Sequence, residues 1–454
     1  MTDEQRLSVK EKVGYALGDA ASNFFFQFFG LFLVFYYTDV AGLSAAAVGT
    51  MMLVTRMFDA VTDPLMGVLA DRTRTRWGRF RPWLLWMCIP YAVIGVAMFM
   101  MPDWSPNAKL AYAYVTYSAM MLAYTAINVP YSALMGVMSD SSQERTRLSS
   151  FRFVAAFGAG MLISYFALDL KDALGGGDDR VGFMWTMAIF AVLSVICFLI
   201  TFKTTKERVE PPVSESSKSV WADFGLLLRC SPWVILFFVS LFNLTSFMVR
   251  NGAQIYYFKY VVGDESAAKW FMTAGMIAAM VGIALAPRIT AILGKRTAMI
   301  YMSGIAAVIN LSFFILPTSE YSLLLTMNIL SALIGAPAGA IIWAMYADTA
   351  DLIEWEHGRR LTGLVYAGVL FAIKMGVAFG GAFIGWLLAW YGFVPNEDPS
   401  DKAVLGIRIA FAIVPALISF LAVISLLMYR LTDKKVIEIE EELKVRRSAC
   451  EDGA

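Results

Sequence analysis

The chain has little of what catalysis and metal binding usually require. Among 454 residues it has one histidine, His357, and four cysteines, Cys88, Cys197, Cys230 and Cys450, without any paired spacing. These few histidine and cysteine residues form no zinc, haem or Cys/His nucleophile motif. It also has no glycine-rich phosphate loop. We therefore expect neither an enzyme nor a cofactor.

Charge is also scarce. Charged side chains make up 16% of the residues, hydrophobic ones make up 59%, and the formal net charge is +1. This is more apolar surface than a soluble globule of this length carries. The basic residues fall in short runs rather than on one concentrated face, which argues against nucleic acid as a partner. The composition predicts a polytopic protein whose partner is the lipid bilayer.

Apolar segments of spanning length recur along the whole chain. There are twelve of them, at about 13–39, 45–70, 82–101, 108–136, 151–170, 181–202, 232–260, 266–290, 297–316, 321–347, 361–391 and 405–430. The first is too long for a signal-peptide core, so we expect it to be retained. The predicted fold class is an all-α membrane protein with twelve transmembrane helices.

Basic residues mark every second connection between these segments. RTRTRWGRFR, QERTRLSSFR, KTTKERVE, GKR and HGRR lie on one side, and connections poorer in Lys and Arg, such as GLSAA and GDESAAK, lie on the other. By the positive-inside rule, the N and C termini are predicted to be cytoplasmic.

The most polar connection, KTTKERVEPPVSESSKS, divides the chain near its middle. We expect a six-helix bundle at 1–205, a cytoplasmic loop at 206–228, a second six-helix bundle at 229–431 and a cytoplasmic tail at 432–454. Two such halves around a midplane cavity are a common transporter plan. In the tail, alternating charge with Val436, Ile437, Ile439 and Leu443 predicts a short amphipathic surface helix.

Two acids lie inside one of the apolar segments. Asp59 and Asp63 are four residues apart in MMLVTRMFDAVTDPLMGVLA, so they share a helix face and can share one cation. A carboxylate at mid-membrane costs about 2.5–3.5 kcal/mol on insertion scales, which favours a role in handling ions or protons. Arg56 lies on the same face and could hold one carboxylate charged while the other changes partner.

Several motifs together resemble one transporter family. GVLADRTRTRWGRFRPW, YYTDVAGLS, FDAVTDPLMG, YTAINVPYSAL and YADTADLIEWEHGRR are spread over essentially the whole chain. They resemble the glycoside-pentoside-hexuronide:cation symporters, of which melibiose permease is the best-known member, within the major facilitator superfamily. The resemblance implies the major facilitator fold and a place in the bacterial cytoplasmic (inner) membrane.

The resemblance implies a cation site. Asp59 and Asp63 fall on the family's cation-binding carboxylates, Thr62 takes the place of an asparagine in melibiose permease, and Thr125 falls on a further cation-site hydroxyl. All four are oxygen donors, which suits Na⁺, Li⁺ or, through carboxylate protonation, H⁺.

The resemblance also implies a sugar site with altered chemistry. Asn23 and Asn128 stand where melibiose permease has sugar-binding aspartates, while Arg152 and Lys374 fall on the family's sugar-side arginine and its lysine near the cavity. An amide both donates and accepts hydrogen bonds, so a sugar acid or a differently configured glycoside becomes plausible. Either cation could pair with a substrate carboxylate.

Further polar residues surround these positions. Tyr124, Asn128 and Tyr131 recur at spacings of four and three and so form one helix stripe, suited to the floor of a pyranose site or to ordinary helix packing. Asp19 lies four residues before Asn23 and is a further intramembrane acid.

A last set of charges favours gating rather than ligand binding. Asp348, Asp351 and Glu354 are spaced by three, and the loop that begins with Asp71 and Arg72 supplies partners of opposite charge.

The sequence thus predicts secondary active uptake of a glycoside, pentoside or sugar acid, coupled to inward movement of Na⁺ or H⁺ by alternating access, in a monomer. A cation-coupled lysolipid carrier is one alternative. A non-transporting membrane sensor is another, but the residues after the last apolar segment are too few for a signalling domain.

Overall fold

The structure is a computed structural model that describes residues 7–139, 142–208, 220–358, 361–395 and 397–451. Within these ranges the side chains of Asp59 and Asp71 lie outside the described part. The regular secondary structure of the described residues is helical apart from one isolated bridge between Thr75 and Gly78. Helices satisfy their backbone hydrogen bonds internally, which is the requirement for a segment that crosses lipid.

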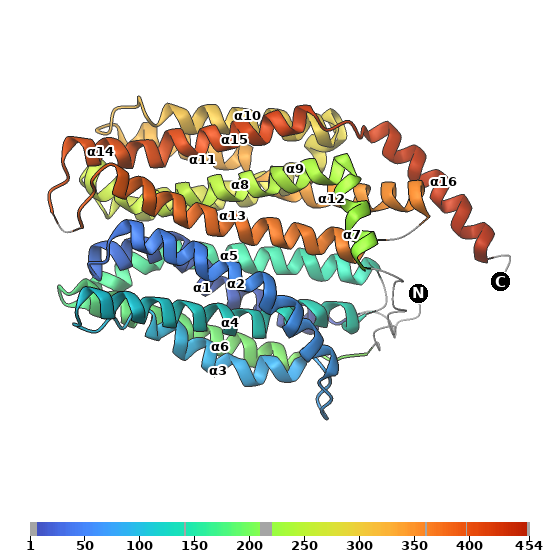
Figure 1. Ribbon diagram of the computed structural model, residues 1–454, viewed down its shortest axis with the longest axis horizontal. Helices are drawn as coiled ribbons and strands as arrows, with labels where there is room; N and C mark the ends of the chain where they lie inside the picture. The colour runs from blue at the N-terminus through green and yellow to red at the C-terminus, as the bar shows by residue number, and fades with distance from the viewer. Residues whose placement is uncertain (1–6, 140–141, 209–219, 359–360, 396, 452–454) are drawn as a thin grey trace. The chain divides into compact units, whose positions relative to one another are not determined.

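Six long helices form the first part of the chain, and they run side by side in Figure 1. Their bounds are α1 Val9–Phe28, α2 Ala45–Arg72, α3 Arg81–Ala97, α4 Pro106–Met138, α5 Ser142–Gly175 and α6 Asp179–Thr204. Helix α1 packs against α5 and α6, α3 packs against α4 and α6, and α2 packs against α4. Five-residue π-helical segments, η2 Phe29–Leu33 and η3 Tyr36–Val40, continue α1.

The second part of the described chain contains ten α-helices and two π-helical segments. Their bounds are α7 Val220–Arg229, α8 Ser231–Tyr256, η4 Tyr257–Val262, α9 Ala267–Leu293, α10 Lys295–Ser312, α11 Tyr321–Gly335, α12 Pro337–His357, α13 Thr362–Trp390, α14 Asp401–Arg408, η5 Ile409–Ile413, α15 Val414–Leu427 and α16 Asp433–Glu451, with the two π segments included. Helix α10 packs against α11, α12 and α15, and α16 packs against α12.

Four segments expected as single α-helices contain a break or a π-helical segment. The segment at 13–39 contains η2 and η3, and the segment at 232–260 runs into η4. The segment at 321–347 consists of α11 and α12, which meet at Ala336 just before Pro337. The segment at 405–430 contains α14, η5 and α15, with Pro415 in the first turn of α15. Proline lacks an N–H and its ring displaces the carbonyl four residues earlier, so a helix interior breaks or widens there.

The contacts divide the chain into two compact units. Unit 1 contains residues 1–213, 251–273 and 381–406, and unit 2 contains residues 214–250, 274–380 and 407–454. Most of the predicted cation and sugar residues belong to unit 1, whereas Lys374 and the three acids of α12 belong to unit 2.

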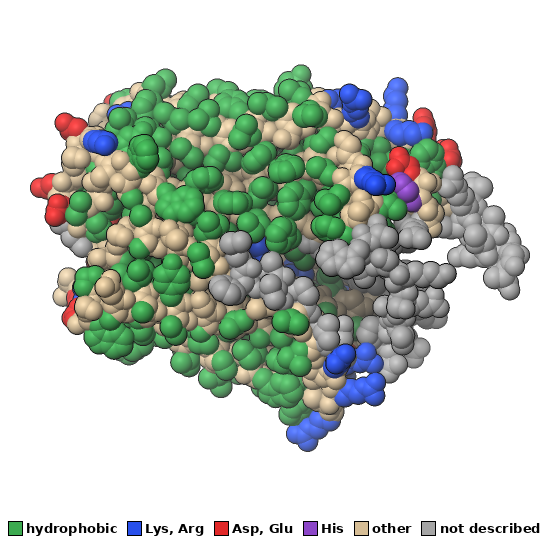
Figure 2. Space-filling view, viewed as in Figure 1, with side chains coloured by type: hydrophobic (Ala, Val, Ile, Leu, Met, Phe, Trp, Pro, Cys, Tyr) green, Lys and Arg blue, Asp and Glu red, His purple; other side chains and the backbone are tan. Residues whose placement is uncertain are grey.

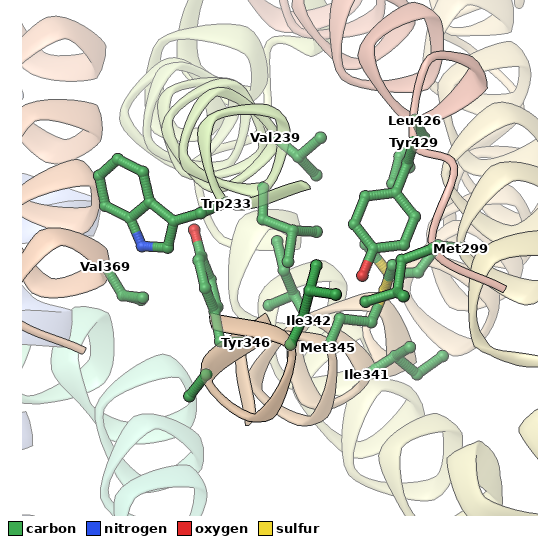
Figure 3. Close-up of a cluster of buried hydrophobic side chains, with 14 of the residues drawn as sticks. Trp233, Val239, Met299, Ile341, Ile342, Met345, Tyr346, Val369, Leu426 and Tyr429 are labelled. Carbon is green, nitrogen blue, oxygen red and sulfur yellow. The ribbon is translucent and has the colours of Figure 1, made fainter. Parts of the chain in front are cut away.

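Each unit has its own apolar core. In unit 1, the rings of Phe28 and Phe99 lie 5.2 Å apart, and Phe183 packs against both. In unit 2, Trp233, Tyr346 and Tyr429 are buried among aliphatic side chains from α8, α10, α12 and α15 (Figure 3). Aromatic side chains bury large areas, so each cluster fixes the packing of several helices.

Apolar side chains also cover the outside of the helices. Figure 2 shows hydrophobic side chains along the helices of the visible face, with charged side chains gathered near the helix ends. Among the described residues, eight helices are long and apolar enough to cross a membrane, and the shorter apolar helices Ala45–Arg56 and Arg81–Ala97 accompany them. This distribution is typical of a protein in a bilayer.

The tail is helical, as predicted, but its apolar face is narrower than expected. Val436, Ile439 and Leu443 of α16 are buried in the core of unit 2, whereas Ile437 is 55% exposed. Residues 436, 439 and 443 share one face of a 3.6-residue helix, and residue 437 lies about 100° away. The short helix α7, at the end of the predicted middle loop, was not predicted from the sequence.

Candidate functional site

Helices α1, α4 and α5 bring three of the predicted sugar-site residues together in unit 1. Arg152 of α5 donates a hydrogen bond from Nη2 to Asp19 Oδ1 of α1 at 3.0 Å, and both side chains are largely buried. The Arg152 guanidinium also lies 5.0 Å from the centre of the Tyr131 ring of α4. A planar cation held by a carboxylate and an aromatic face is a strong, directional recognition group.

Tyr131 is itself held in place by a second tyrosine. The Tyr15 hydroxyl donates to the Tyr131 carbonyl at 3.1 Å, and the Tyr131 hydroxyl donates to the Tyr15 carbonyl at 2.8 Å. The two rings stack with centroids 4.7 Å apart. This reciprocal pair fixes α1 against α4 beside Arg152.

The two asparagines of the predicted sugar site have different surroundings. Asn23 donates to the Asp19 carbonyl at 2.8 Å within its own helix. Asn128 accepts a hydrogen bond from the Ser22 hydroxyl at 2.8 Å, which joins α4 to α1, and donates to the Tyr124 carbonyl at 3.2 Å. Ser22 was not predicted, although its position three residues after Asp19 places both on one helix face.

Two of the residues predicted for the cation site contact each other. The Thr125 hydroxyl of α4 donates to Asp63 Oδ1 of α2 at 2.8 Å, and Thr125 is buried. Thr62 is half-buried next to Asp63, and the Asp59 side chain lies outside the described residues. The guanidinium of Arg56, which is buried, donates from Nε to the Tyr117 hydroxyl at 3.2 Å. Tyr117 is thus a partner of Arg56 that sequence reasoning missed.

The remaining predicted residues lie elsewhere. Asp348 of α12 forms an ion pair with Lys295 of α10, with Nζ 2.6 and 2.7 Å from its two carboxylate oxygens. In the same unit, Asp351, Glu354 and Lys374 are half-buried. Arg72 is exposed at the last residue of α2, and Asp71 beside it lies outside the described side chains.

The basic loop after α2 has an anchor that the sequence analysis missed. The Glu207 carboxylate accepts hydrogen bonds from the backbone N–H groups of Arg79, Phe80 and Arg81, at 2.9, 2.9 and 3.0 Å. Phe80 is the N-cap residue of α3, and its own side chain makes no capping hydrogen bond to the first turn. A negative group at a helix N-terminus satisfies orphan donors and complements the helix dipole.

Comparison with known proteins identifies the family. Residues 14–433 match the family described as MFS/sugar transport protein. The chain belongs to this family. It is 38% identical over 447 residues to Inner membrane symporter YicJ of Escherichia coli (strain K12), covering 98% of this chain and 97% of the relative. It is 39% identical over 445 residues to Putative glycoside/cation symporter YagG of the same organism, covering 98% and 96%.

Solved structures show the same fold. The crystal structure of D-xylose-proton symporter superposes with a TM-score of 0.62 at 13% identity, covering 91% of this chain and 96% of that one. The resemblance to the glycoside-pentoside-hexuronide:cation symporters is therefore confirmed. The protein is a major facilitator transporter of the inner membrane with several spans, and it is not an enzyme.

Proposed function

We propose that this transporter couples inward movement of Na⁺ or H⁺ to uptake of a glycoside, pentoside or sugar acid by alternating access. The hydrogen bond from Thr125 to Asp63 carries the proposal, because it joins a membrane carboxylate of α2 to the helix that also bears Asn128 and Tyr131. A cation at Asp63 and a sugar at Asn128 would therefore both act on α4.

Electrostatics supply the driving force for coupling. Asp59 and Asp63 are four residues apart in sequence, a spacing that predicts one helix face and mutual repulsion of the two carboxylates until a cation neutralises them. Ordering of α2 against α4 through Thr125 then changes the position of Asn128. Thermodynamic reciprocity requires the sugar to tighten cation binding by the factor by which the cation tightens sugar binding.

The chemistry around Arg152 supports a sugar or sugar acid. Arg152 offers a guanidinium, Asp19 a carboxylate, Asn128 an amide and Tyr131 an aromatic face within three packed helices. Vicinal hydroxyls can bind to the carboxylate and amide, and a uronate would compete with Asp19 for the guanidinium. The relative named a glycoside/cation symporter fits the same class of solute.

We further propose twelve spans with both termini in the cytoplasm. The basic end of unit 1 is held together by the ion pair of Lys12 with Glu144 at 2.7 Å and by the hydrogen bond of Arg208 to Glu11 at 2.6 Å. The loop RTRTRWGRFR lies at this same end, through Glu207. Basic loops remain on the cytoplasmic side, so the opposite end, which carries Asp39, faces outward.

Transport by the purified protein in liposomes tests the proposal. Imposed Na⁺ or H⁺ gradients should each be tried against labelled glycosides, pentosides and uronides, with Asp63→Asn as the coupling variant. We expect one gradient to drive accumulation in the native protein and Asp63→Asn to abolish that response while solute binding persists. Accumulation that ignores both gradients, or that lysolipids inhibit and glycosides do not, would contradict the proposal.

A further inference from the structure

Asp39 is a buried acid at the end of unit 1 away from the basic loop. Its side chain, at the end of η3, is 1% exposed. Lys259 of η4 lies 3.3 Å from Asp39 Oδ1, and the Tyr260 hydroxyl donates to the same oxygen. The neighbouring Thr38 hydroxyl lies 2.5 Å from the Tyr256 hydroxyl of α8. Residues from 38–39 and from 256–260, far apart in sequence, thus share one polar cluster.

A second set of ion pairs lies at the same end and joins α5 to the start of α9. Lys171, whose side chain is 5% exposed, lies 3.0 Å from the carboxylate of Glu265 and also contacts Asp172 and Asp179. Lys269 forms an ion pair with Asp169 and stacks 4.1 Å from the Tyr165 ring centre. The pairs Lys171–Glu265 and Asp169–Lys269 again join residues before 205 to residues after 229.

Backbone contact between α2 and α13 completes this end. A Cβ added at Gly385 would lie 2.4 Å from the Ala45 carbonyl and 2.9 Å from Gly49 Cα. A Cβ at Gly49 would lie 2.7 Å from the Ala382 carbonyl. The two helices therefore touch where neither has room for a side chain, and any added carbon would force them apart.

We infer that Asp39 is the central positioning residue of an outer gate, which holds the outward end closed through Lys259 and Tyr260 and is supported by Lys171–Glu265, Asp169–Lys269 and the Gly49–Gly385 contact. The inference rests on the proposed alternating access and orientation. Asp39 contacts neither the sugar-site nor the cation-site residues described above, so it acts on the transport cycle through the position of the helices.

The physical reason lies in which contacts a rocking motion would break. If each half of the sequence rocks as a body, contacts between residues of the same half are kept. The contacts of Asp39, Asp169 and Glu265 join the two halves of the sequence, so opening must separate these charges and hydrate them. Buried pairs with good geometry hold such an interface in one arrangement, and their loss moves the equilibrium toward the other.

Spin-label distances across the outer end test the gate directly. Labels are placed at exposed Asn107 and Lys402, in a chain whose four native cysteines are replaced by alanine. We expect Asp39→Ala to shift the distance distribution toward longer values in the absence of substrate. Gly385→Leu should cause the same shift by steric contact.

A charge exchange guards against variants that fail to fold. Asp169→Lys alone should repel Lys269 and lengthen the distances, and adding Lys269→Asp should restore the native distribution. The matched control is Asp103→Asn. Asp103 forms ion pairs with Arg180 and Lys109 at this same end, but all three residues lie in the first half, so the distribution should not change.

Unchanged distances in Asp39→Ala, Gly385→Leu and Asp169→Lys would overturn the gate. Failure of the proposed function would look different, because the distance measurement needs neither a solute nor a gradient. A shift in distance without any gradient-driven uptake would support the outer gate and contradict the proposed symport. Gradient-driven uptake with no shift in distance in any variant would support the proposed symport and contradict the outer gate.

Discussion

The Thr125 hydroxyl links Asp63, a residue of the proposed cation site, to α4, the helix that carries Asn128 of the proposed sugar site. Thr125 bonds to Asp63 across helices, while one turn later on the same helix Asn128 bonds to Ser22 of α1. The sequence gives the types and spacing of these side chains, because Thr125 and Asn128 share a helix face at a separation of three. The direction of the Thr125 hydroxyl toward α2 comes only from the packing of α2 against α4.

Removing this hydroxyl should weaken cation coupling. A hydrogen bond to a charged group contributes about 1.5–3 kcal/mol, and about 1.4 kcal/mol corresponds to a tenfold change in an equilibrium constant. Thr125→Ala should therefore raise the half-saturating cation concentration by about 10- to 100-fold, measured from the cation dependence of uptake. The control is Thr55→Ala, because the buried Thr55 hydroxyl bonds only to carbonyls of its own helix, at 2.7 and 3.3 Å. Equal cation dependence in both variants would contradict the role of Thr125.

The start of α3 is an element whose stability depends on one distant side chain. Glu207 is more than a hundred residues away in sequence from the three N–H groups that donate hydrogen bonds to it. Gly78 makes this approach possible, since its φ of 109° suits glycine and an added Cβ would lie 2.4 Å from the Glu207 carboxylate. The loop and the segment after α6 therefore behave as one element.

Loss of this cap should loosen the end of the bundle. Capping groups typically contribute about 0.5–2 kcal/mol, so Glu207→Ala should lower the midpoint of thermal unfolding in detergent and speed protease cleavage within residues 73–80. Glu207→Gln retains an acceptor oxygen and should be milder. Exposed Glu397 provides the control through Glu397→Ala, which should leave both readouts unchanged. Cleavage at the native rate in Glu207→Ala would show that the cap is dispensable.

Helix α16 is a second element that tertiary contacts hold in place. Asp433 accepts a hydrogen bond from the Lys295 backbone N–H at 3.0 Å, at the start of α10, and Trp355 of α12 donates to Glu442 at 2.7 Å. Lys435 also stacks 4.8 Å from the Trp355 ring centre. The tail helix thus contacts the ends of α10 and α12, next to the pair of Lys295 with Asp348.

Two neighbouring isoleucines test this docking. Ile439 is 1% exposed and Ile437 is 55% exposed. Ile439→Ala should cost about 2–5 kcal/mol because it leaves a cavity, whereas a change at an exposed position such as Ile437→Ala stays within about 0.5 kcal/mol. Thermal unfolding in detergent and the rate of proteolysis of the tail measure the difference. Similar behaviour of the two variants would mean that α16 is not docked in solution.

At the scale of the whole molecule, the proposed orientation in the membrane rests on where the charged residues lie. In unit 1, the basic loop RTRTRWGRFR lies at the end that carries Glu207, while Asp39, Asp103 and Asp169 lie at the other. There a hydrogen bond from Arg180 lowers the pKa of the exposed Asp103 carboxyl below its ordinary value.

Reporter fusions test the resulting topology. With twelve spans and cytoplasmic termini, alkaline phosphatase fused after Gly177 or Gly263 should be active, because these loops face outward. Fusions after Lys206 or Gly294 should be inactive as phosphatase and fluorescent as green fluorescent protein. An active phosphatase after Lys206 would invert the proposed orientation or remove a span.

The predicted residues differ in how far the sequence could place them. The ion pair of Arg152 with Asp19 could have been predicted from the sequence, since both residues were identified as charged site residues on separate predicted helices. Partners of Asp348 were predicted in the arginine-rich loop, and this stays a prediction; the structure shows an ion pair of Asp348 with Lys295 of α10. No sequence pattern around Glu207 or Tyr117 indicates which residues they contact. The role of Asp59 in the cation site stays a prediction, because its side chain lies outside the described residues.

The sequence by itself determined that this chain is a membrane transporter of its family, because apolar length, scarce charge and local motifs are properties of consecutive residues. Only the tertiary structure decided which charges meet. Asp39 with Lys259, Lys171 with Glu265 and Glu207 with the start of α3 join residues that lie far apart along the chain. Such contacts follow from how helices pack, and helix packing depends on the shapes of many side chains together rather than on any one segment.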